Sequence, residues 1–108
     1  MSWKYICKSH DLIENAGVAA LVENQQIALF FVPATNEQVF AIGNWDPIGK
    51  ANVLSRGLIA HLKDDWVVAS PLYKEHYSLK TGKCQEADVH VPVWPVKVVD
   101  EEVYVKVA

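Results

Sequence analysis

The stretch Val96-Lys97-Val98-Val99-Asp100-Glu101-Glu102-Val103-Tyr104-Val105-Lys106-Val107 carries the clearest structural signal in the chain. Apolar and polar residues alternate on both sides of its acidic triplet, and such alternation is typical of strands that turn one face towards a core. The stretch therefore predicts a two-stranded antiparallel ribbon with one valine-lined face turned inward. Because the triplet lacks Asn-Gly or Asp-Gly, we expect a connection slightly longer than a tight two-residue turn.

The rest of the chain reads as further short strands separated by turns. Predicted strands cover residues 3–8, 17–22, 26–32, 38–42, 58–62, 66–69 and 76–79. The run 26–32 is almost continuously apolar, so we expect it to be buried on both faces. About nine or ten short strands predict an all-β, antiparallel sandwich or barrel. The length of 108 residues favours a single domain over residues 1–108.

Helix signals are weak. Residues 9–14 favour one helical turn at most, with Ser9 as a possible cap and with Leu12 and Ile13 facing the core. In the turn after residue 79, Gly82 is suited to a positive φ. Trp94 lies between two prolines that favour an extended path, which predicts a core aromatic next to the final ribbon.

Composition excludes several classes of function. The net charge is −3, and the basic residues are scattered, so the sequence predicts no nucleic-acid partner. No apolar run has the length of a signal peptide or a membrane span, and we expect a cytoplasmic protein without a membrane partner. The two cysteines, Cys7 and Cys84, exclude a disulfide scaffold and a four-cysteine zinc site.

Two irregular loops follow strand-like segments. The first is Asn44-Trp45-Asp46-Pro47-Ile48 and the second is Ser70-Pro71-Leu72-Tyr73, with a glycine-containing hairpin between them and Thr81-Gly82 after them. This order resembles the Rieske-type ferredoxin domain, in which the loops carry Cys-x-His and Cys-x-x-His. The resemblance implies a Rieske-like fold with an inserted, degenerate cluster-binding region at about residues 43–77.

The four positions that would hold a [2Fe–2S] cluster do not fit it. In this resemblance Asp46 and Ser70 stand at the cysteine positions, and Ile48 and Tyr73 stand at the histidine positions. Such a centre needs two thiolates and two imidazoles, whereas Ile48 has no lone pair and the other three offer hard oxygen donors. We therefore expect a retained fold without a cofactor or metal in this chain.

A Rieske-like chain of this length without cluster ligands resembles the small-subunit family of bacterial NADH-dependent nitrite reductases. The loops Asn44-Trp45-Asp46-Pro47 and Ser70-Pro71-Leu72-Tyr73-Lys74 carry that resemblance. It implies association with a large subunit that carries FAD, a [4Fe–4S] cluster and sirohaem and reduces nitrite to ammonium in nitrate assimilation. No catalytic residue is then expected in this chain, and NADH would bind the partner.

The two loops form an exposed apex in a Rieske domain, which makes them candidates for partner binding. Its apolar residues here are Trp45, Pro47, Ile48, Pro71, Leu72 and Tyr73. Exposed aromatic and aliphatic groups are typical of protein interfaces. Alternatively, these side chains turn inward and fill the space of the cluster. Both hold if Ile48 and Leu72 point inward while Trp45 and Tyr73 point partly outward.

Two other functions remain open. One is an electron carrier with an atypical metal site built from Asp46, Tyr73 and a nearby histidine, and the other is a free-standing interaction module. Cys7 and His10 have no second pair at zinc-site spacing, and a catalytic pair of Cys84 with His76 lacks a nucleophile motif. The adjacent carboxylates at 64–65 and 101–102 are typical of solvated turns.

Overall fold

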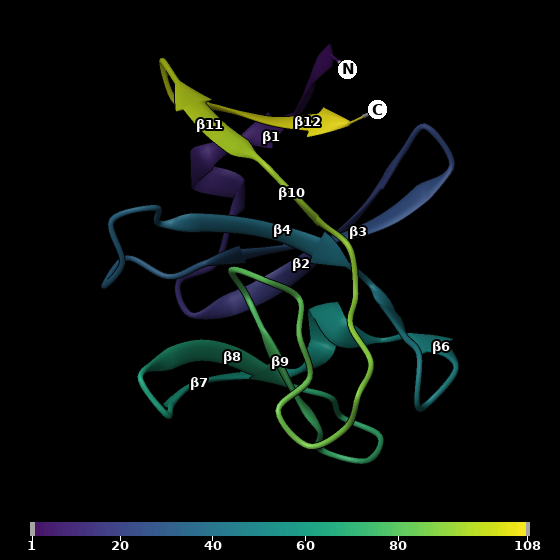
Figure 1. Ribbon diagram of the computed structural model, residues 1–108. Coiled ribbons are helices and arrows are strands. Elements are labelled where there is room, and N and C mark those ends of the chain that lie inside the picture. The colour runs from purple at the N-terminus through teal and green to yellow at the C-terminus, as the bar shows by residue number, and fades with distance from the viewer. Residues whose placement is uncertain (1, 108) are drawn as a thin grey trace.

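The computed structural model describes residues 2–107, which form four antiparallel sheets (Figure 1). The strands are β1 (Ser2–Lys8), β2 (Ala16–Val22), β3 (Gln25–Phe31), β4 (Val39–Gly43), β5 (Trp45–Asp46), β6 (Ala51–Asn52), β7 (Leu58–Leu62), β8 (Asp65–Ala69), β9 (His76–Ser78), β10 (Val93–Trp94), β11 (Val96–Val99) and β12 (Glu102–Val107). Two short 3-10 helices, η1 (Ser9–Asp11) and η2 (Leu54–Arg56), complete the elements, and residues 2–107 contain no α-helix. The all-β class is therefore confirmed.

The C-terminal ribbon is part of a three-stranded sheet with the order β1-β12-β11. The predicted ribbon of two strands was incomplete because β1 pairs along the free edge of β12, from Ser2 opposite Val107 to Lys8 opposite Glu102. The valines of β12 are fully buried, as the alternation predicts, whereas Val98 of β11 is 46% exposed. The inward valine face therefore belongs to the central strand, where both edges are paired.

Three hairpins turn through two residues that both have positive φ. The central residues are Glu23-Asn24, Lys63-Asp64 and Asp100-Glu101. Val99 pairs directly with Glu102, so the expected longer connection between β11 and β12 is wrong. A two-residue turn with positive φ at both positions matches the twist of the two strands that it joins. Here the strand pairing forces non-glycine residues to adopt this positive φ.

The central sheet, β10-β4-β3-β2, lies between the other layers (Figure 1). Ile27 and Leu29 of β3 pack against the buried valines of β12, while Ala28 and Phe30 face the opposite way, into a core with Leu54, Val68 and Tyr77. This confirms that the apolar run of β3 is buried on both faces, because each face of a central layer meets a core. The sheets stack as layers and do not close into a barrel within residues 2–107.

The layer on the other side of the central sheet from β12 contains β7, β8 and β9. Strands β5 and β6 pair with each other in a short hairpin. The predicted helical turn is η1, but Lys8 rather than Ser9 occupies its N-cap, and Ile13 is 60% exposed. Leu12 is buried as expected; Ile13 follows the end of η1 and turns to solvent. Gly82 has the predicted positive φ of 78°.

None of the helices in the described part of the chain is long and apolar enough to cross a membrane.

Candidate functional site

The two loops that resemble cluster-binding loops meet through a pair of buried side chains. Asp46 lies at the end of β5, directly after β4, and Ser70 follows β8; their exposed fractions are 0% and 1%. The Ser70 hydroxyl donates a hydrogen bond of 2.5 Å to Oδ2 of Asp46. We call residues 44–50 and 70–77 the apex, and this hydrogen bond joins its two halves.

The Asp46 carboxylate accepts hydrogen bonds from four donors. In addition to Ser70, its Oδ1 accepts from the Tyr77 hydroxyl at 2.9 Å and from the backbone N–H groups of Ile48 and Gly49 at 2.9 and 3.1 Å. Tyr77 is fully buried and belongs to β9, so the second half of the apex is attached to the same carboxylate at two points. Buried carboxylates persist when their oxygens are paired in this way.

Local backbone geometry allows the loop to wrap around this carboxylate. A Cβ atom on Gly49 would lie 2.4 Å from Leu72 Cδ1 and 2.9 Å from Asp46 Oδ2, so a larger residue would require the Leu72 side chain or the carboxylate to shift. The Asn44 side chain accepts a hydrogen bond of 2.8 Å from the Ser55 backbone N–H, which fixes the start of the loop to η2. The apex is therefore ordered by its own polar contacts.

The electrostatics of the site favour the ionised form of Asp46. Burial alone would raise the pKa of this carboxyl, but hydrogen bonds from Ser70, Gly49, Ile48 and Tyr77 together hold it below its ordinary value. Burial, followed by the hydrogen bond to Asp46, raises the pKa of Tyr77 well above its ordinary value. The Tyr77 hydroxyl therefore stays protonated and remains a hydrogen-bond donor.

The apolar apex residues divide between core and surface. Ile48 is half-buried and packs against the core that contains Tyr77 and Val68. Trp45 is 49% exposed, Leu72 is 45% exposed and Tyr73 is 67% exposed. Leu72 is therefore not buried as the inward alternative expects: its Cδ1 lies over Gly49, and much of the side chain remains exposed. Of the two prolines, Pro47 is half-buried and Pro71 is exposed.

The geometry gives little support to a metal site at these positions. A [2Fe–2S] cluster does not fit, since Ser70 and Asp46 contact each other directly and Ile48 packs into the core. All four hydrogen-bond donors around Asp46 compete with a metal ion for its oxygens. Among residues 2–107, no three His, Cys, Asp or Glu side chains form a group that could hold a metal ion.

Cys84 and His76 both contact Glu86. The His76 ring nitrogen Nδ1 lies 2.6 Å from Glu86 Oε2, and Cys84 Sγ lies 3.7 Å from Glu86 Oε1. Burial would raise the pKa of Glu86, but hydrogen bonds from the backbone and ring of His76 hold it below its ordinary value. Within residues 2–107 no hydrogen bond joins Cys84 to His76, so the imidazole is paired with a carboxylate and not with the thiol.

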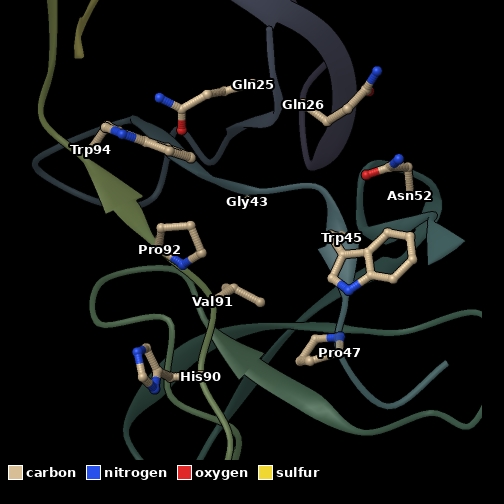
Figure 2. Close-up of a pocket in the computed structure, with 10 residues that line it drawn as sticks. All are labelled: Gln25, Gln26, Gly43, Trp45, Pro47, Asn52, His90, Val91, Pro92 and Trp94. Atoms are coloured by element: carbon tan, nitrogen blue, oxygen red, sulfur yellow. The ribbon is translucent and has the colours of Figure 1, made fainter. Parts of the chain in front are cut away.

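A groove extends from the apex along the central sheet (Figure 2). Trp45, Pro47 and Asn52 lie at one end, and Trp94 and Gln25 lie at the other, with Gly43 and Pro92 between them. We call this surface the tryptophan groove; its volume is about 300 Å³. Sequence reasoning missed Trp94, Gln25 and Asn52 as site residues because they come from separate segments and no spacing links them.

Comparison with known proteins agrees with this geometry. A family profile described as "Rieske-like [2Fe-2S] domain" matches residues 2–106. The "Nitrite reductase (NADH) small subunit" of Escherichia coli (strain K12) is 48% identical over 84 residues, which cover 78% of this chain and 77% of that protein. The solution structure of a nitrite reductase [NAD(P)H] small subunit from Erwinia carotovora has 45% identity and a TM-score of 0.82, and the match covers 100% of this chain and 84% of that one.

A third relative is a much longer protein. The "Nitrite reductase [NAD(P)H] large subunit" of Klebsiella oxytoca is 39% identical over 104 residues, which are 95% of this chain but only 11% of that protein. A domain similar to this chain is thus one part of a much longer polypeptide.

The fold defines a class: the chain has a Rieske-like domain. At the positions that resemble its cluster ligands the chain carries Asp46, Ile48, Ser70 and Tyr73. Within that class, the chain belongs to the family of nitrite reductase (NADH) small subunits, with large subunits of the same enzyme as partners.

Proposed function

We propose that this chain is the cluster-free small subunit of a cytoplasmic NADH-dependent nitrite reductase and that it acts by binding the large subunit through its apex. The large subunit would carry the redox groups and reduce nitrite to ammonium. The small subunit would support its stability, its assembly or its electron delivery by contact. The observation that carries the proposal is the hydrogen bond between Asp46 and Ser70, which joins the two loops directly.

Three further findings support this function. The apex presents Trp45, Leu72 and Tyr73 to solvent on a framework ordered from below by Asp46 and Tyr77. Rigid, exposed aromatic side chains are effective interface anchors because little entropy is lost when they bind. The Klebsiella oxytoca relative carries this kind of domain in a chain named as the large subunit, which supports a physical association. Free thiols at Cys7 and Cys84 suit a reducing compartment.

The test is a binding measurement with the purified large subunit. We expect Trp45→Ala combined with Tyr73→Ala to weaken association at least about tenfold, as hot-spot aromatic residues commonly do. A matched control replaces Tyr5 and Leu21, which are 50% and 65% exposed and lie outside the apex, with alanine. Unchanged binding by the apex variant, with its fold intact, would contradict the proposal.

The cluster-free assignment has its own test. Protein purified without oxygen is assayed for iron and for labile sulfide, and its visible absorption spectrum is recorded. We expect neither stoichiometric iron nor sulfide, because Asp46 and Ser70 are engaged with each other. Stoichiometric iron with sulfide would favour the electron-carrier alternative.

A further inference from the structure

The tryptophan groove has the chemistry of a peptide-binding surface. We propose that it receives an extended, uncharged segment of the large subunit, with a proline or aliphatic side chain placed between Trp45 and Trp94. This inference rests on the proposed function, since it names the part of the partner that binds beside the apex. It concerns a surface of the central sheet and adds to the contacts of the apex loops.

The lining of the groove selects against charged ligands. Although 21% of the chain is Asp, Glu, Lys or Arg, none of these residues, among those that the structure describes, lines the groove. A charged group that entered it would lose hydration, and among the described lining residues the imidazole of His90 is the one side chain able to carry a charge that could offset this loss. By contrast, the amides of Gln25, Gln26 and Asn52 each offer donors and an acceptor, which is what the backbone of an extended peptide requires.

The shape of the groove suits a narrow apolar segment. Trp94 and Trp45 stand on opposite sides of a floor made by Gly43 and Pro92 (Figure 2). Aromatic-walled grooves of this kind bind proline-rich or aliphatic segments in an extended conformation. A Cβ atom on Gly43 would lie 2.9 Å from Pro92 Cδ, so the Pro92 ring lies close against Gly43 in this floor.

The floor is also preorganised. The Gly43 N–H donates a hydrogen bond of 2.8 Å to the Pro92 carbonyl, and β10 pairs with β4 at Val93 and Trp94. Trp94 is half-buried and packs against the core that lies between the central sheet and β12, so its indole is held in place. A groove whose walls are fixed before binding loses less entropy when a ligand binds.

Continuity with the apex identifies the occupant. Trp45 and Pro47 belong both to the apex and to the groove wall, so a partner that covers the apex also reaches this wall. The partner proposed for the apex is the large subunit, and a segment of that same chain needs no additional binding event to enter the groove. This favours a segment of the large subunit over an independent ligand.

The experiment places negative charge in the groove and measures binding of the purified large subunit. Gln26→Glu combined with Asn52→Asp keeps side-chain size at two exposed positions and adds two charges. The matched control, Asn36→Asp combined with Gln38→Glu, adds the same charge at exposed positions outside the groove. We expect the groove variant to bind at least about tenfold more weakly, because the new carboxylates lose hydration beneath the bound segment.

The outcomes separate this inference from the proposed function. If the wild-type chain fails to bind the large subunit, the proposed function is overturned and the inference with it. If the wild type binds and the groove variant binds equally well, only the inference is overturned. Weak binding by the groove variant and normal binding by the control support it, provided that both variants keep the wild-type urea midpoint.

A second readout identifies the segment. A photoreactive amino acid at position 26 is activated in the complex, and the attached large-subunit peptide is sequenced by mass spectrometry. We expect an uncharged peptide that contains proline or aliphatic residues. A charged peptide, or no cross-link from a chain that still binds, would overturn the inference.

Discussion

Ser70 and Asp46 are 24 positions apart in sequence, yet their buried side chains share a hydrogen bond of 2.5 Å. The resemblance to Rieske ferredoxins places a cluster cysteine at each of these two positions. Where a cluster would bridge the loops, a hydroxyl and a carboxylate join them directly. This hydrogen bond fixes the position of the two apex loops relative to each other.

Removal of the Asp46 carboxylate should destabilise the fold. We expect Asp46→Ala to lower the free energy of unfolding by about 3–5 kcal/mol, because four donors lose their acceptor at a buried site. Urea denaturation at neutral pH measures the change. The control Asp88→Ala removes an exposed carboxylate and should change stability by less than about 0.5 kcal/mol. Equal losses in the two variants would show that the contacts of Asp46 are not stabilising.

Ser70 and Tyr77 should be energetically coupled through the carboxylate that they share. We expect Ser70→Ala and Tyr77→Phe each to cost about 1–3 kcal/mol, since each removes one donor to a charged acceptor. When one donor is absent, the charge of the Asp46 carboxylate depends more strongly on the hydrogen bond from the remaining donor. The double variant should therefore lose at least about 0.5 kcal/mol more than the sum of the single losses. Strict additivity in urea denaturation would contradict this coupling.

The stability of the fold should depend on the ionisation of Asp46 at acid pH. Because hydrogen bonds lower its folded-state pKa from the ordinary 3.8, its contribution is present above that value and is lost as pH falls through the folded-state pKa. We expect the stability difference between wild type and Asp46→Asn to shrink from neutral pH to about pH 2. The other carboxylates with lowered pKa values, those of Glu37, Glu86 and Glu102, contribute equally to both proteins. A difference that is independent of pH would argue that Asp46 is not ionised in the fold.

The turn between β11 and β12 offers a stabilising substitution. Asp100 and Glu101 have φ values of 52° and 66°, which disfavour residues with a Cβ atom. Asp100→Asn combined with Glu101→Gly places the preferred residues in this turn, and we expect a gain of about 1 kcal/mol. Thermal denaturation tests it. Asp88→Gly, at an exposed position where φ is not positive, should lower stability instead, and a loss in both variants would contradict the argument.

Much of the fold follows from local pattern. The alternation in β12 and the unbroken apolar run of β3 predict one-sided and two-sided burial, and the structure has both. Alternation failed at Val98, because β11 is an edge strand whose side chains need not meet the core. The expectation drawn from the turn residues failed at Asp100 and Glu101, where strand pairing outweighs the conformational preference of the two residues.

The sequence by itself determined the all-β class and the burial of β3 and β12, because hydrophobic periodicity is a local property. Only the tertiary structure decided that Asp46 contacts Ser70 and Tyr77, that Leu72 faces solvent, and that Trp45 and Trp94 share a groove. These contacts join segments far apart in the chain, and their geometry depends on how the layers pack. No spacing along the sequence contains that information.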